Sequence, residues 1–68
     1  MTKEEVLEGL KELILELKED KIKDIDAQKI WSGKETKIHE AAAQLNSCDA
    51  SWVNDQYGVW FETTIRSS

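Results

Sequence analysis

Residues 3–19 repeat their apolar side chains at the spacing of an α-helix. The repeat follows an i, i+4, i+7, i+8, i+11 pattern and consists of Val6, Leu10, Leu13, Ile14 and Leu17. Together with Leu7, these side chains cover an arc of about 120° around a helix. Thr2 and Glu5 have the spacing of a capping box. The pattern therefore predicts a helix over 3–19 whose apolar face packs against the rest of the chain or against a partner.

The length of 68 residues leaves room for one small domain, spanning 1–68. A chain of this size buries only about 60% of the surface that its unfolded form exposes. Its single cysteine rules out an internal disulfide and gives no framework for a metal. We therefore expect self-association or a partner protein to contribute to its stability.

The middle of the chain carries two weaker helix signals. Residues 22–31 are moderately apolar, and Asp24 stands where it can cap a helix. Ser32 and Gly33 interrupt this pattern, and Ser32 with Glu35 has the spacing of a second capping box. We therefore expect one helix to end near residue 31 and another to run from residue 32 to Leu45.

The last third, after a helix stop at Asn46, permits three interpretations. In the first, Asp49 caps a short helix over 50–57, and a strand follows over 59–65. In the second, 51–54 and 58–64 form a β-hairpin. In the third, the helix continues and places four side chains on one face: Trp52, Val53, Tyr57 and Trp60. Because residues 59–65 are rich in β-branched and aromatic side chains, we favour the strand.

The sequence thus predicts a mainly α fold, a domain of two or three helices with a C-terminal hairpin or strand as an α+β alternative. Reactive groups are scarce in it. His39 and Cys48 are the only candidates for an activated thiolate, and one His with one Cys cannot complete a tetrahedral metal site. We expect no enzymatic activity, no catalytic residue, no metal and no cofactor.

Fourteen acidic residues against nine basic ones give a net charge of −5. This balance argues against direct binding of nucleic acid, whose phosphates attract basic proteins. The segments 41–46 and 51–53 have the rhythm of a helix-turn-helix, which suggests a transcriptional regulator as a third interpretation. Asp49 and Asp55 flank the second segment, however, and no Lys or Arg lies near it.

The polar side of the first predicted helix carries an unbroken i, i+4 row of acids, hereafter the acidic row: Glu4, Glu8, Glu12 and Glu16. Successive members lie about 6 Å apart along the helix axis. Leu15 falls on the same side, outside the apolar stripe. The row either keeps the protein solvated or presents an anionic surface to a basic, nucleic-acid-handling protein by imitating phosphates.

Aromatic residues gather near the C-terminus. Trp52, Tyr57 and Trp60 lie within ten positions, and tryptophan and tyrosine are favoured anchors of protein interfaces. These side chains form either the core of the domain or an exposed patch for a partner.

We therefore expect a non-catalytic protein-binding module: a small acidic regulator or inhibitor of the kind that phages and mobile elements encode. It would block a host protein through the acidic row and the aromatic patch. The alternative is a structural homo-oligomer, such as a homodimer formed through the stripe of the first helix or through paired 59–65 strands. No apolar run approaches the roughly 18 residues that cross a bilayer. With no apolar signal-peptide core at its start, the chain is expected in the cytoplasm, away from membranes.

Overall fold

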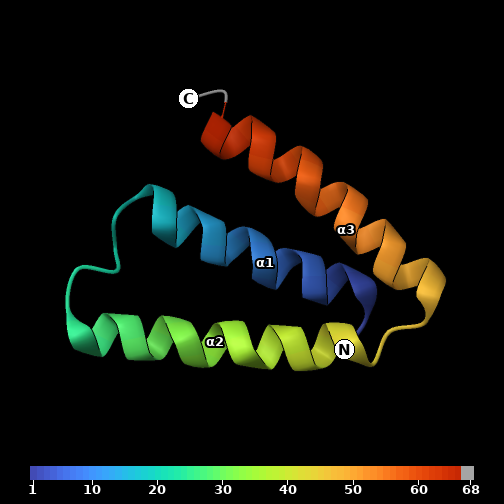
Figure 1. Cartoon of the computed structure of the whole chain (residues 1–68), viewed down its shortest axis with the longest axis horizontal. Coiled ribbons are helices and arrows are strands. Elements are labelled where there is room, and N and C mark those ends of the chain that lie inside the picture. The colour runs from blue at the N-terminus through green and yellow to red at the C-terminus, as the bar shows by residue number, and fades with distance from the viewer. Residues whose placement is uncertain (67–68) are drawn as a thin grey trace.

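The computed structural model describes residues 1–66, which form three α-helices and a short π-helical extension (Figure 1). Their bounds are α1 Lys3–Lys18, α2 Ile25–Ala43, α3 Ser47–Phe61 and η1 Glu62–Arg66. The mainly α prediction is confirmed. Within residues 1–66 there is no strand, so the predicted hairpin and the predicted 59–65 strand are both wrong.

The first two helices begin where the sequence predicts. The Thr2 hydroxyl accepts a hydrogen bond from the Glu5 backbone N–H at 3.3 Å, and the Glu5 carboxylate accepts one from the Thr2 N–H at 3.3 Å. This reciprocal pair is the predicted capping box. Asp24 caps α2 by accepting from the Ala27 N–H at 2.8 Å. Local side chains therefore determine both starting points.

Helix α1 ends in a turn that the sequence analysis does not predict. The Lys21 N–H donates to the Glu16 carbonyl at 3.0 Å, and the Asp20 N–H donates to the Leu17 carbonyl at 3.2 Å. This is the pattern of a Schellman motif. Asp20 occupies the left-handed position with φ of 55°, where glycine is the usual residue. The motif turns the chain back towards α2.

The expected break at Ser32-Gly33 is wrong, because α2 is a single helix across both residues. The Ser32 carbonyl accepts a hydrogen bond from the Thr36 hydroxyl at 3.0 Å, as in a helix interior. Trp31 and Ile38, two turns apart on either side of Gly33, both pack into the core. Tertiary packing of these two side chains thus outweighs the local break signal.

Gly33 is exposed, and a Cβ added there would meet no atom within 4 Å. Because glycine disfavours an exposed helix interior by up to about 1 kcal/mol relative to alanine, Gly33→Ala should raise the free energy of unfolding by about 0.5–1 kcal/mol. Urea denaturation followed by circular dichroism measures this. An unchanged or lowered stability would contradict a continuous α2.

The helical interpretation of the last third is the one that the structure adopts. Asn46 is the N-cap of α3 and accepts from the Asp49 N–H at 2.8 Å, so Asp49 lies inside the helix. Val53 and Thr64, eleven residues apart, are both buried. Val59 and Phe61, which an alternating strand would place together on one side, are both exposed. An i, i+11 spacing repeats every three turns of a helix, so the buried positions follow helical and not alternating order.

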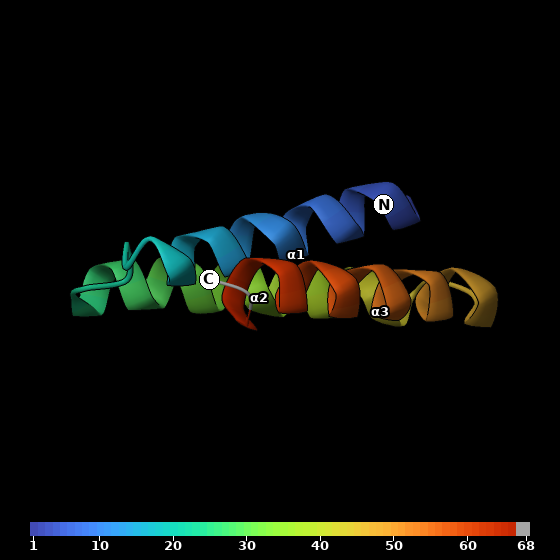
Figure 2. The same cartoon turned by 90° about the horizontal axis from the view of Figure 1, so that it is seen from above.

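The three helices form a single layer with α1 in the middle (Figure 1). Both α2 and α3 pack against α1 and make little contact with each other. The Cα atoms span 36 × 27 × 12 Å, and the view from above shows α1 displaced to one side of the plane of α2 and α3 (Figure 2). The core therefore lies along α1 and consists of Val6, Leu13, Ile38 and Val53. Both broad faces of the layer remain open to solvent.

Candidate functional site

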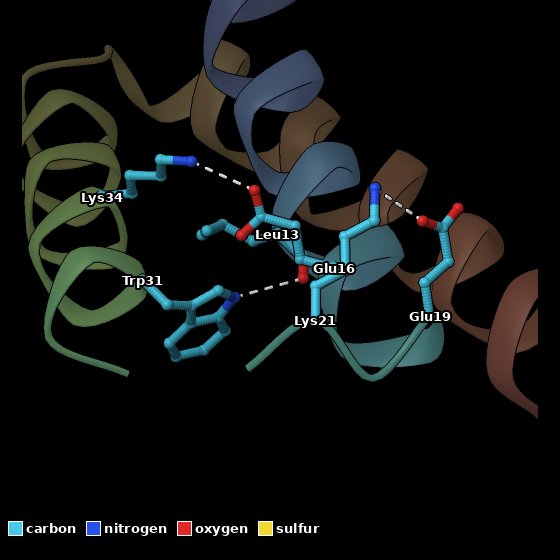
Figure 3. A network of polar contacts seen from close by, with 6 residues as sticks. All are labelled: Leu13, Glu16, Glu19, Lys21, Trp31 and Lys34. Atoms are coloured by element: carbon cyan, nitrogen blue, oxygen red, sulfur yellow. Dashed lines mark hydrogen bonds and ion pairs between the residues drawn. The ribbon is translucent and has the colours of Figure 1, made fainter. Parts of the chain in front are cut away.

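The acidic row lies on the outer side of α1. Glu4, Glu8 and Glu12 are exposed, and none of them forms an ion pair within residues 1–66. Glu16 differs, because its carboxylate accepts from the Lys34 ammonium of α2 at 3.0 Å (Figure 3). The row therefore has an unpaired N-terminal part and a C-terminal end that is tied to α2.

A hollow of about 270 Å³ separates the second half of the row from α2. Glu12 and Glu16 line it from α1, and Lys34 and Lys37 line it from α2. Two lysines opposite two glutamates balance the charge there. The anionic surface predicted for the whole row is thus concentrated at Glu4 and Glu8.

Leu15 lies beside the acidic row and remains 37% exposed. It lines a shallow depression with Glu12, Glu16 and two residues from the end of α1. One of these, Glu19, pairs with Lys21 at 2.7 Å (Figure 3). This hydrogen bond and the charge of Glu19 raise the pKa of Lys21. Leu15 therefore offers a small apolar contact within a charged surface.

The predicted aromatic patch is divided between two surfaces. The Lys3 ammonium lies 4.9 Å from the ring centroid of Trp52, and that of Lys11 lies 5.3 Å from the ring of Trp60. Both tryptophans are half-buried along the seam between α1 and α3. Tyr57 is turned about 140° from Trp52 around α3. The ring of Tyr57 packs instead on Phe61, with centroids 6.2 Å apart.

Sequence reasoning missed the two lysines that cover the tryptophans. Lys3 and Lys11 are eight residues apart, and so are Trp52 and Trp60. Because α1 and α3 run in the same direction (Figure 1), equal spacing on the two helices brings each cation over one ring. Lys3 also lies 3.8 Å from the carboxylate of Asp49. The matched spacing was the signal available in the sequence.

The sequence alone also does not predict a hydrogen bond made by a third tryptophan, Trp31. Its indole N–H donates to the Leu13 carbonyl at 3.3 Å and so joins α2 to α1 (Figure 3). The indole N–H of Trp60, in contrast, is buried and has no hydrogen-bond partner within residues 1–66. Trp31 thus has a structural role in the α1–α2 contact.

Most of the apolar stripe of α1, through which a homodimer was predicted to form, is buried within the chain itself. Val6 and Leu13 are buried by α2 and α3, whereas Leu10 is half-buried and Leu17 is 48% exposed. The predicted seam therefore retains only Leu10 and Leu17 for an intermolecular contact. Pairing of 59–65 strands has no basis, because these residues belong to α3 and η1.

The residues considered for catalysis or metal binding stand on different helices. His39 is exposed on α2, and Cys48 is exposed in the first turn of α3. Across the described part of the chain, no three His, Cys, Asp or Glu side chains gather as metal ligands.

None of the helices in residues 1–66 is long and apolar enough to cross a membrane. Comparisons of this chain with protein-family models, curated proteins and solved structures find no match.

Proposed function

We propose that this protein is a non-catalytic protein-binding module, a small acidic regulator or inhibitor of the type that phages and mobile elements encode. It acts by placing the acidic row of α1 in a basic site of a host protein. The observation that carries the proposal is the exposure of Glu4 and Glu8, one turn apart on α1, neither of which forms an ion pair within residues 1–66.

The free-energy cost of placing glutamates at successive i, i+4 positions supports a role of the acidic row in binding. Like charges at i, i+4 destabilise a helix by a few tenths of a kcal/mol for each pair. Successive glutamates lie about 6 Å apart along α1, so the row is a regular linear array of negative charge. A cleft that binds the backbone of a nucleic acid is lined with Lys and Arg. A basic, nucleic-acid-handling protein in the cytoplasm is therefore the partner class that the row fits best.

The side chains beside the row supply apolar contact. Leu15 is exposed within it, and Trp52 and Trp60 lie along the neighbouring seam under flexible lysine side chains. Charge complementarity accelerates the encounter of two proteins, whereas desolvated aromatic and aliphatic contacts slow their dissociation. The row thus directs association, and these three side chains hold the complex.

The test is capture of the partner from nuclease-treated lysate of the source cell by the tagged protein, followed by mass spectrometry and affinity measurement on the purified partner. Glu4→Lys with Glu8→Lys should weaken binding at least about tenfold and reduce its salt dependence. The matched control is Glu40→Lys with Asp55→Lys, which changes the net charge equally at exposed positions on α2 and α3. Circular dichroism verifies that both variants fold.

Equal weakening by the two double variants would mean that net charge alone matters, and the role of the acidic row would be rejected. Recovery of the bait alone would favour the homo-oligomer, and a salt-sensitive shift of DNA mobility would favour the transcriptional regulator.

A further inference from the structure

One broad face of the helical layer carries an apolar groove that the acidic row does not include. Between α2 and α3 lies a hollow of about 310 Å³ to which all three helices contribute. Leu10 of α1 lines it together with Ile38 and Ala42 of α2 and Ala50 and Val53 of α3. All three α-helices of residues 1–66 line the hollow, and none of them lies across it, because α2 and α3 make little contact with each other.

The apolar surface continues towards the end of α3. Leu17 follows Leu10 by two turns on the same side of α1 and is 48% exposed. Tyr57 follows Ala50 by the same interval, and Phe61, whose ring packs at a tilt on that of Tyr57, is 36% exposed. Towards this end α2 and α3 diverge (Figure 1). The lining of the hollow itself ends at Leu10, Val53 and Asn54, and these exposed apolar side chains extend the apolar surface beyond it.

The exposed surface of the protein agrees with an incomplete bundle. The accessible area is 4911 Å² for a mass of 7.8 kDa. A compact monomer of this mass is expected to expose roughly 4,400 Å². The excess of roughly 500 Å² is comparable with the ~800 Å² that one partner contributes to a standard interface. One further helix laid in the groove would convert the layer into a four-helix bundle.

The charge near the hollow favours a basic occupant. Within residues 1–66, no Lys or Arg lines the hollow, and the lining residues of α3 are uncharged: Ala50, Val53 and Asn54. On the opposite wall, Glu35 lies one and two turns before the lining residues His39 and Ala42. Burial, and then the nearby Glu35 carboxylate, raise the pKa of Tyr57, so Glu35 lies close enough to influence that ring. A second copy of the chain, with a net charge of −5, would meet like charge here.

We propose that the groove between α2 and α3 binds an amphipathic helix of the partner protein, with an apolar stripe that packs on Leu17, Tyr57 and Phe61 and with basic residues beside that stripe. This is helix-in-groove recognition. The inference rests on the proposed function, a protein-binding module, and adds a second contact surface. Glu12 is turned about 160° from Leu10 around α1, so the groove and the acidic row address different parts of the partner.

The experiment measures binding of a labelled synthetic helical peptide to the full chain. The peptide carries leucines at i, i+3, i+4 and i+7 with flanking lysines. One control peptide has the same composition in scrambled order, and another has flanking glutamates. We expect saturable binding of the first peptide, at least tenfold weaker binding of both controls, and amide NMR shifts concentrated at Leu10, Leu17, Tyr57 and Phe61. Equal binding of the scrambled peptide, or no saturable binding of the first, would overturn the proposal.

Matched variants locate the contact. Leu17→Ser with Phe61→Ser should reduce peptide affinity at least tenfold, whereas Ile25→Ser with Val59→Ser, at exposed apolar positions outside the groove, should leave it unchanged. An equal loss in both would overturn the proposal. So would a wild-type dimer in sedimentation equilibrium that the Leu17 and Phe61 substitutions dissociate, because the occupant would then be a second copy.

The role of the acidic row and the role of the groove can each be rejected independently of the other. The variant with Glu4→Lys and Glu8→Lys retains the groove and should bind the lysine-flanked peptide within about twofold of the wild type, after correction for net charge with the Glu40→Lys, Asp55→Lys control. If it binds the peptide but the natural partner binds all acidic-row variants equally, the acidic row is rejected and the groove stands. If the groove variants bind the natural partner normally, the groove is rejected and the row stands.

Discussion

Leu13→Ala should lower the free energy of unfolding by about 2–5 kcal/mol, the range for truncation of a buried leucine. Leu13 is 4% exposed and packs in the core with Val6, Ile38 and Val53. A domain of this length has a total stability of roughly 3–10 kcal/mol at the usual value per residue. The substitution therefore removes a large share of that stability, and a substantial unfolded population is expected at 37 °C. Urea titration followed by far-ultraviolet circular dichroism measures the loss.

Leu15→Ala is the matched control, two residues further along α1. Leu15 lies outside the core and is partly exposed, so its truncation should change the stability by no more than about 0.5 kcal/mol. If the two substitutions destabilised the protein equally, the orientation of α1 in the layer would be wrong.

Gly9→Leu should have the second-largest effect, a loss of about 2 kcal/mol, because added bulk at a close helix contact costs about 1–3 kcal/mol. A Cβ on Gly9 would lie 2.8 Å from the Cδ1 atom of Ile38 and 3.1 Å from its Cγ1 atom. The rest of a leucine side chain would push α2 away from α1. This cost exceeds the gain of somewhat less than 1 kcal/mol that leucine brings to a helix interior.

Gly58→Leu separates the contact from helix propensity. Gly58 lies within α3, and a Cβ there would meet no atom within 4 Å. Its substitution should therefore raise the stability by somewhat less than 1 kcal/mol. The two leucines are expected to act with opposite sign in the same urea titration. Stabilisation by both would show that α1 and α2 do not approach each other at Gly9.

The sequence predictions were correct where a structure depends on residues close together in the chain, and wrong where it depends on contacts between distant residues. Helix α1 was predicted almost to the residue, because its capping box and apolar stripe lie within the helix itself. The start of α2 at Asp24 was equally local. The interruption at Ser32-Gly33 was wrong, because contacts of Trp31 and Ile38 with α1 stabilise a helix through two residues of low propensity. The 59–65 strand was wrong because β propensity depends on a partner strand, and α1 offers Thr64 a helical surface instead.

The candidate site likewise combines features that depend on local spacing with features that depend on contacts between helices. The spacing of the acidic row placed its members on the polar side of α1, and Glu4 and Glu8 are exposed as that spacing implies. The partner of Glu16 is Lys34, eighteen residues away on another helix, and no local pattern identifies such a pair. The separation of Tyr57 from Trp52 likewise depended on whether the segment was helix or strand.

The sequence by itself determined that the chain is mainly helical, where α1 and α2 begin, and which side of α1 carries its acids, since these depend on periodicity and on caps a few residues apart. Only the tertiary structure decided that α2 is continuous, that α3 is a helix, and that α1 lies between them with a groove left open. Those outcomes depend on burial of Val6, Leu13, Ile38 and Val53 against one another, and contacts between residues so distant in the chain are not encoded in any local pattern.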